Sequence, residues 1–244
     1  LGNHWPDLLL PEAEQEKSSP WASLPWRQAR IRVFLAAVDL HRAFVEENAQ
    51  RMKANLALAM MVLDGNVSDP AIRRIAFDSL ALCCPVISTT FASAASLFGN
   101  MGPDSIGWLL IDEAGQATPQ NAAGAIWRSR RTIAVGDPLQ LEPVTTVPHS
   151  IEAALAKHFG DTPECWWPSR TSVQVMADRN NAVGTYLQQQ SRAGGEPQQW
   201  VGAPLRVHRR CDEPMFSISN RIAYNGLMVH QKPAPTIAWP PSAW

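Results

Sequence analysis

Three features that mark common protein classes are missing from this sequence of 244 residues. Its four cysteines are scattered and form no CxxC pair, which argues against a disulfide framework or a zinc site. No run approaches the ~20 consecutive apolar residues of a membrane span. Lys and Arg number 21 against 22 Asp and Glu, so any contact with nucleic acid must come from local patches. We therefore expect reduced thiols and a cytoplasmic protein that does not enter a membrane.

The sequence also lacks the features of a chain start. It begins LGNHWPDLLLPEAEQEK, without a Met and without the basic-then-apolar layout of a secretory signal. A length of 244 residues fits one large domain or two small ones, and the apolar content of 45% is enough to build a sizeable core. The expectation is an internal piece of a longer gene product.

Residues 1–82 are predicted to form a helical N-terminal region. Apolar side chains recur at helical spacing from Trp26, and Gly65 ends the run. One kinked helix or an antiparallel pair would fit this length. Asp69 and Pro70 then have the residue types of a helix cap and a first helical turn.

Short apolar runs alternate with helical segments across residues 83–160. The runs are CCPVIST, IGWLLID and TIAVGD, and the helical segments between them are FASAASLF and TPQNAAGAIW. Strands buried on both faces that alternate with helices are typical of a parallel sheet in an α/β domain. Residues 161–204 are predicted to be a loop-rich insertion with a helix over SVQVMADRNNAVGTYL. Residues 205–244 then begin with a strand, APLRVHRR, and a helix, DEPMFSISNRIAY, before a proline-rich end.

Two adjacent carboxylates follow the most apolar of these runs, LLIDEAGQATP. Asp112 and Glu113 would emerge at the C-terminal edge of the sheet, where open α/β sheets bind ligands. Asp112 has the oxygen chemistry to hold a hydrated Mg²⁺, and Glu113 could polarise a water aimed at a phosphate. A strand that simply meets solvent at an acidic pair is the alternative interpretation of this segment.

A second polar segment, AVGDPLQLEPV, follows one helix later. It is another apolar run that breaks at Gly-Asp, and Pro138 stiffens the turn. Gln140 carries a neutral amide that can donate to a γ-phosphate or to an attacking water. Taken alone, Gly-Asp-Pro would be an ordinary turn. The order and spacing of the two segments favour a shared site.

Together these segments resemble the nucleotide-hydrolysis motifs of superfamily 1 helicases, in the branch that includes the nonsense-mediated-decay helicase. That family has DEAxQA as its Walker B motif and GDxxQLxP as its motif III; the matches here are DEAGQA at 112–117 and GDPLQLEP at 136–143. Gly115 stands where the family usually has Ser. The resemblance implies a truncated RecA-like parallel sheet of the P-loop NTPase type. It also implies Mg²⁺ and ATP as cofactors, with Gln116 and Asp137 among the nucleotide-binding residues.

Upstream, CPVISTTFASA resembles the family segment whose hydroxyls touch the nucleic-acid backbone. Neutral hydroxyls suit contacts to phosphate oxygens. The hydroxyl-bearing residues here are Ser88, Thr89, Thr90 and Ser93. Capping of the helix that follows would explain the same hydroxyls.

Downstream, LRVHRRCDEPMFSISNRIAYNGLM resembles the start of the family's second RecA-like lobe. There an arginine in a YRM or YRC context reaches the γ-phosphate, and Arg210, followed by Cys211, is the best match. A planar and permanently charged guanidinium suits the charge spread over a transferring phosphoryl group. Arg209 replaces the usual aromatic residue, so a register shifted by one residue stays open. A solvated basic strand end is the alternative.

The family's Walker A motif, GxxxxGK[ST], does not occur, because no lysine in this sequence follows a glycine. The resemblance therefore implies a fragment of an ATP-dependent helicase or translocase that is inactive alone. Its partners would be single-stranded DNA or RNA and the remainder of the helicase core. The alternative is a noncatalytic module that binds nucleic acid or a protein partner and retains the motifs by descent.

Overall fold

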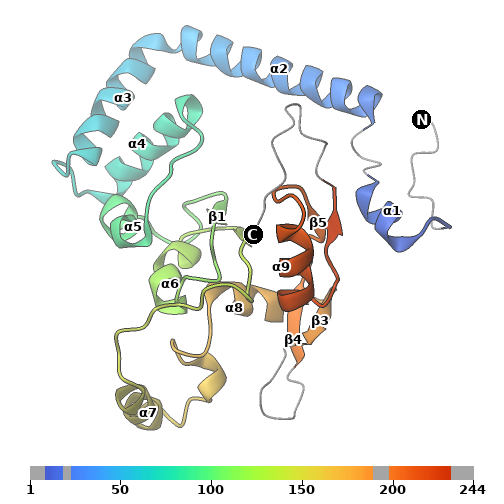
Figure 1. Ribbon diagram of the computed structural model, residues 1–244. Coiled ribbons are helices and arrows are strands. Elements are labelled where there is room, and N and C mark those ends of the chain that lie inside the picture. Colours follow the sequence, from blue (N-terminus) through green and yellow to red (C-terminus); the bar gives the residue numbers. More distant parts are fainter. Residues whose placement is uncertain (1–8, 19–22, 189–197, 232–244) are drawn as a thin grey trace. The chain divides into compact units, whose positions relative to one another are not determined.

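The computed structural model describes residues 9–18, 23–188 and 198–231, and its elements form two compact units. The middle unit comprises residues 33–180, and the terminal unit comprises residues 1–32 and 181–244. The fold is mixed α/β with short pairs of strands (Figure 1). The proline-rich end at 232–244, and most of the glycine- and glutamine-rich stretch after residue 188, lie outside the described residues.

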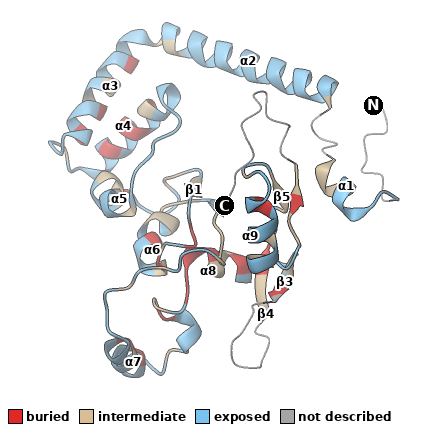
Figure 2. Cartoon of the chain, in the orientation of Figure 1, coloured by how far each residue is buried: buried red, intermediate tan, exposed pale blue. Residues whose placement is uncertain are grey.

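Helices fill the first part of the described chain. Helix α1 (Glu12–Lys17) belongs to the terminal unit, and the long helix α2 (Leu24–Glu47) runs into the middle unit. Asn48 separates α2 from α3 (Ala49–Leu63), so the long helical pattern is interrupted at one residue. Figure 2 shows α2 exposed along its length, and none of its residues is buried.

Helix α4 (Pro70–Cys83) packs against α3 and begins where the sequence predicts. The Asp69 carboxylate accepts the backbone N–H groups of Ala71 at 2.8 Å and Ile72 at 3.2 Å, and Pro70 occupies the first turn. A proline there loses no hydrogen bond, because that N–H has no intrahelical partner. Apolar residues of the two helices and one following residue form the first core cluster: Ala59, Val62, Ala76, Phe77 and Met101.

The central sheet of the middle unit contains two parallel strands. Strand β1 (Leu109–Ile111) pairs with β2 (Thr132–Ala134), with Leu110 opposite Ile133. Helix α6 (Pro119–Trp127) connects the two strands, as expected for a parallel pair. The predicted strands and the helix between them are therefore confirmed.

The strand predicted over CCPVIST is wrong. No strand is assigned between α4 and α5 (Phe91–Phe98), and Val86 and Ile87 are exposed. A strand needs a hydrogen-bonding neighbour, and within the described residues β1 pairs only with β2. The apolar, β-branched composition of this segment thus reflects a preference that the tertiary structure does not use.

A second core cluster lies on one face of this sheet. Helix α7 (His149–His158) and a 3-10 turn (Glu164–Trp166) precede α8 (Val173–Arg179). The cluster joins strand, loop and helix residues: Ile111, Ala114, Ala122 and Val173 are buried within it. On the opposite face of the sheet, Leu110 and Ile133 are exposed.

The terminal unit contains two further strand pairs. Strands β3 (Gly184–Gln188) and β4 (Gln198–Gly202) are antiparallel, and β5 (Val207–His208) pairs in parallel with β6 (Val229–His230). Helix α9 (Met215–Ala223) connects β5 to β6, so the predicted strand and helix of this region are confirmed.

The helix predicted over SVQVMADRNNAVGTYL is only half right, because α8 ends at Arg179 and residues 184–188 form β3. Thr185 and Tyr186 have the β-branched and aromatic side chains that favour strands, and Tyr186 packs on Trp200 across the hairpin. Cross-strand pairing therefore overrides the helical spacing.

No helix in the part of the chain that the structure describes is both long and apolar enough to cross a membrane.

Candidate functional site

The two acidic loops lie side by side at one edge of the sheet. The backbone N–H of Ala114 donates to the Val135 carbonyl at 3.0 Å, and Val135 N–H donates to Ile111 O at 2.8 Å. These bonds extend the β1–β2 ladder beyond the strands and into both loops. The segments that carry Asp112 and Asp137 are thus joined through their backbones.

Two glycines make this approach possible. A Cβ on Gly136 would lie 2.6 Å from the Gly115 nitrogen, and a Cβ on Gly115 would lie 2.7 Å from the Asp137 carbonyl oxygen. Such distances to backbone atoms cannot be relieved by rotating a side chain. Gly115, which stands where the resembling family usually has Ser, is therefore a position of close backbone contact in this chain.

The backbone turns sharply at the acidic pair. Glu113 has a φ of +52°, a left-handed conformation that is uncommon for residues other than glycine. Its N–H donates to Asp112 Oδ1 at 3.0 Å, which leaves Oδ2 without a partner among the described residues. Gln116 Nε2 donates to Glu113 Oε2 at 3.3 Å. Asp112 and Glu113 are both exposed. The loop therefore presents two carboxylates to solvent, each anchored through one oxygen.

The second loop is organised by Asp137. Its Oδ1 accepts the N–H of Leu139 at 2.9 Å, and its Oδ2 accepts from Gln140 Nε2, also at 2.9 Å. Asp137 thus shapes its own turn with both oxygens. Gln140 is exposed, and its amide retains a carbonyl oxygen and a second N–H.

Helix α8 supports the first loop from a part of the chain that sequence analysis did not connect with it. Val173 N–H donates to Ala117 O at 2.9 Å, and Gln174 N–H donates to Ala114 O at 3.1 Å. Ser172 caps the helix by accepting from Val175 N–H at 3.2 Å. A serine before an apolar run was the available signal for the cap, but no local pattern predicts which carbonyls the first turn meets.

The predicted hydroxyl segment is exposed at the start of α5. Thr90 caps this helix by accepting from Ser93 N–H at 3.3 Å, and its hydroxyl also donates to Ser93 Oγ. Thr89 Oγ1 donates to Thr90 O at 3.4 Å. Ser88 has no hydrogen-bond partner among the described residues. The capping interpretation therefore applies to Thr90, whereas Ser88 keeps its hydroxyl available.

The two candidate arginines of the terminal unit differ in their contacts. Arg209 Nη2 donates to Gln231 Oε1 at 2.9 Å. Arg210 is exposed, and no hydrogen bond or ion pair joins it to another described residue. Within the described residues, the Arg209 guanidinium thus has one hydrogen-bond partner and the Arg210 guanidinium has none.

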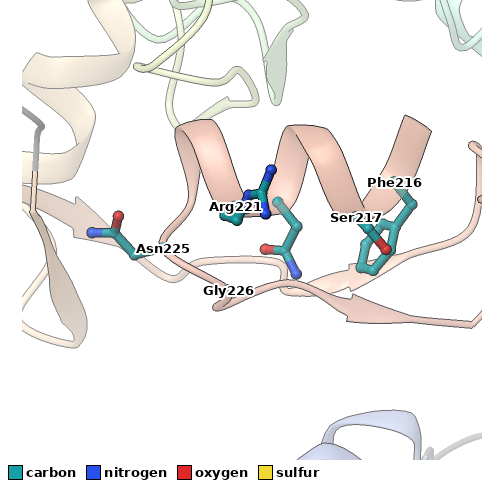
Figure 3. Close-up of a pocket in the computed structure, with 6 residues that line it drawn as sticks. Phe216, Ser217, Arg221, Asn225 and Gly226 are labelled. Atoms are coloured by element: carbon teal, nitrogen blue, oxygen red, sulfur yellow. The ribbon is translucent and has the colours of Figure 1, made fainter. Parts of the chain in front are cut away.

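An open cavity of about 500 Å³ borders α9 in the terminal unit (Figure 3). Its lining residues are Phe216, Ser217, Asn220, Arg221, Asn225 and Gly226. Ser217 donates to the Glu213 carboxylate, and the Asn220 amide is bound to the backbone N–H and C=O of Met228 at 3.0 Å each. The side chains of Ser217 and Asn220, which line the cavity, are therefore already hydrogen-bonded within the terminal unit.

The carboxylates of the middle unit have the chemistry that a magnesium–nucleotide complex requires. Mg²⁺ in such sites is held by one or two carboxylates together with water and phosphate oxygens, so it needs no all-protein cage. Among the described residues, no group of three or more His, Cys, Asp or Glu side chains is placed to hold a metal ion. Asp112, exposed and with one oxygen uncommitted, fits this role.

Residues 42–147 match the family model of an AAA domain and are similar to a helicase-like domain of that kind. The matched range contains both acidic loops and the hydroxyl segment, and it ends before α8 and Arg210. No curated protein and no solved structure was found to match this chain.

Proposed function

We propose that this chain is part of an ATP-dependent superfamily 1 nucleic-acid helicase or translocase and carries residues of its ATP-hydrolysis site. The observation that supports this most directly is the backbone contact between the loops that carry Glu113 and Gln140. The Ala114–Val135 hydrogen bond and the Gly115–Gly136 approach hold both loops at one sheet edge. Similarity of residues 42–147 to a helicase-like AAA domain is independent support.

In the proposed site, Asp112 would hold Mg²⁺ through its uncommitted oxygen. The metal, when bound with ATP, would neutralise charge on the phosphates. Glu113 would accept a proton from the attacking water through Oε1, while Gln116 holds its Oε2. The left-handed backbone at Glu113 supports this role, since uncommon backbone conformations concentrate at functional sites.

Gln140 would hydrogen-bond to the γ-phosphate or to the water, and Asp137 would orient the Gln140 amide rather than touch the nucleotide itself. Asp137 already accepts from Gln140 Nε2 at 2.9 Å. Arg210 would stabilise charge on the transferring phosphoryl group, and its lack of partners among the described residues supports the choice of Arg210 over Arg209.

Single-stranded DNA or RNA is the proposed polymer partner. Ser88, Thr89, Thr90 and Ser93 would donate hydroxyl hydrogen bonds to its phosphates. Ser88 is the strongest candidate of the four because its hydroxyl has no other partner in the described chain. Contacts to phosphate and sugar carry little sequence information, so binding through this segment should not depend on base sequence.

The phosphate cradle would come from the remainder of the helicase core, because GxxxxGK[ST] does not occur in this sequence. We therefore expect the 244-residue chain to hydrolyse ATP negligibly. The same missing motif supports the second candidate, a noncatalytic binding module that retains the hydrolysis motifs by descent.

The decisive experiment measures ATP turnover and ATP binding by the full-length gene product, with and without single-stranded DNA and RNA. Glu113→Gln should abolish turnover and spare binding, because the amide keeps the size of the side chain and removes the base. Glu142→Gln is the matched control: it is an exposed glutamate near the second loop with no assigned role.

Unchanged turnover in Glu113→Gln would disprove the role of Glu113. Absence of turnover in the unmodified full-length protein, together with binding of single strands, would favour the noncatalytic module. Robust ATP hydrolysis by the 244-residue chain, abolished by Glu113→Gln, would overturn the expectation that the chain is inactive alone.

A further inference from the structure

Two histidines hold the residue that follows Arg210. Cys211 N–H donates to His208 Nε2 at 2.9 Å, and His230 Nε2 lies 3.1 Å from the Cys211 carbonyl oxygen. The histidines are opposite each other in the β5–β6 pair. Both polar groups of one backbone residue are thus bound by side chains from two strands.

Phe216 of α9 fixes the two imidazoles in place. Its ring centroid lies 5.4 Å from that of His208 and 4.7 Å from that of His230, with an interplanar angle of 37° in each pair. Phe216 is 9% exposed and also lines the cavity beside α9 (Figure 3). The rings therefore pack against a buried side chain, and their nitrogens have little freedom to turn away from Cys211.

The partners determine the protonation of the two rings. A backbone N–H can only donate, so Nε2 of His208 must be an unprotonated acceptor, and its ring carries the proton on Nδ1. A carbonyl can only accept, so Nε2 of His230 must carry a proton. The two histidines therefore need different tautomers: Nε2 is unprotonated in His208 and protonated in His230.

From this geometry we infer that His208 and His230 are positioning residues for Arg210, acting through the backbone of Cys211. The inference rests on the proposed role of Arg210. Two more bonds hold the same loop, from Gln231 N–H to His208 O at 2.9 Å and from Arg209 to the Gln231 side chain. The backbone on both sides of Arg210 is fixed, while the Arg210 guanidinium has no partner among the described residues.

This arrangement suits a charged group that must meet a transferring phosphoryl group. A fixed backbone limits where the guanidinium can reach, and pre-organised charge costs little reorganisation during reaction. We call the two bonds from His208 and His230 to the Cys211 backbone the clamp. Loss of the clamp should lower the rate of the chemical step more than the affinity for ATP.

The clamp can be tested first in the 244-residue chain by NMR. The unmodified chain should show Nδ1–H on His208 and Nε2–H on His230 in long-range ¹H–¹⁵N spectra; the opposite assignment for either ring would overturn the inference. Hydrogen exchange of the Cys211 amide then tests the bond itself. His208→Asn should speed this exchange about tenfold, and His208→Gln should restore it, because only the longer amide reaches the position of Nε2.

The same variants in the full-length gene product test the functional part. His208→Asn should lower kcat about tenfold and leave the KM for ATP nearly unchanged, and His208→Gln should recover most of the loss. Added to Arg210→Gln, His208→Asn should lower kcat no further, since its effect passes through Arg210. His230→Leu removes the other bond of the clamp, from His230 to the Cys211 carbonyl. His230→Gln is its control, because the glutamine amide keeps an N–H that can donate to that carbonyl.

The outcomes separate the two levels of the argument. If Arg210→Gln leaves kcat unchanged, the proposed role of Arg210 fails, whatever the histidine variants do. If Arg210→Gln lowers kcat but the Asn and Gln variants of His208 behave alike, the clamp fails and the role of Arg210 stands. A variant that does not fold is identified by its NMR spectrum, and the tautomers of the unmodified chain still decide the geometry.

Discussion

The loops after β1 and β2 and the loop after β5 are fixed by different means. In the middle unit, glycines at 115 and 136 let two backbones meet directly, and hydrogen bonds between those backbones hold the carboxylate-bearing loops. In the terminal unit, imidazoles hold the backbone next to Arg210. In both places the chain leaves a charged side chain exposed while it restrains the backbone that carries it. The difference predicts which substitutions each region tolerates.

The largest effect is expected for Gly136→Ala. The added Cβ would lie 2.6 Å from the Gly115 nitrogen and 2.8 Å from the Ala114 nitrogen, so the two loops must separate. We expect the free energy of unfolding to fall by about 3 kcal/mol, measured by urea unfolding. Gly107→Ala is the control, because a Cβ there meets no atom within 4 Å. Equal stability of the two variants would contradict the backbone contact.

A smaller loss is expected for Gly115→Ser, the residue usual in the resembling family. Its Cβ would lie 2.7 Å from the Asp137 carbonyl oxygen. Unfolding should cost about 2 kcal/mol less than in the unmodified chain, because one contact rather than two must open. Gly102→Ser, at an open position, should unfold like the unmodified chain. Stabilisation by Gly115→Ser would show that the loops are further apart than described.

Removal of the α8 cap by Ser172→Ala should lower the unfolding free energy by about 1 kcal/mol. The Ser172 hydroxyl accepts from Val175 N–H at the end of α8 that supports the first acidic loop. Ser88→Ala is the comparison, since the Ser88 hydroxyl has no partner among the described residues. Thermal or urea unfolding of the pair measures the difference, and identical curves would exclude a stabilising cap.

The smallest effect is expected for the substitution of Arg210 in the terminal unit. Arg210→Gln should change the unfolding free energy by no more than about 0.5 kcal/mol, because Arg210 has no partner among the described residues. Arg206→Gln should cost more, since Arg206 contacts the carboxylates of Glu12 and Glu16 and donates to Leu227 O at 2.9 Å. A larger loss for Arg210→Gln than for Arg206→Gln would show that Arg210 is structural.

Much of the secondary structure follows from local sequence patterns. The Asp69–Pro70 cap, the apolar runs of β1 and β2 and the helix between them each depend on neighbouring residues, and all were predictable. The segment CCPVIST shows the limit, because a strand needs a partner that no local pattern supplies. The second half of the helix predicted after Ser172 fails for the related reason that residues 184–188 find a partner in β4.

The candidate site, like the secondary structure, was predictable from the sequence only in part. Residue type and order alone indicated the two carboxylates and the glutamine, and their loops do adjoin. The contacts of α8 with Ala114 and Ala117, and of two histidines with Cys211, could not be predicted. Three of these four bonds join residues at least 19 positions apart, counted from their numbers in the sequence, and the two histidine bonds depend on ring tautomers that the sequence does not encode.

The sequence by itself determined which chemical groups this protein can offer at the ends of its strands, because residue identity fixes charge, hydrogen-bonding capacity and backbone freedom. Only the tertiary structure decided which of those groups form hydrogen bonds within the protein and which remain exposed. Asp137 is engaged through both carboxylate oxygens, whereas Arg210 stays without a described partner. The physical reason is that a hydrogen bond requires its two atoms within about 3 Å, and for residues distant in sequence only the folded chain sets that distance.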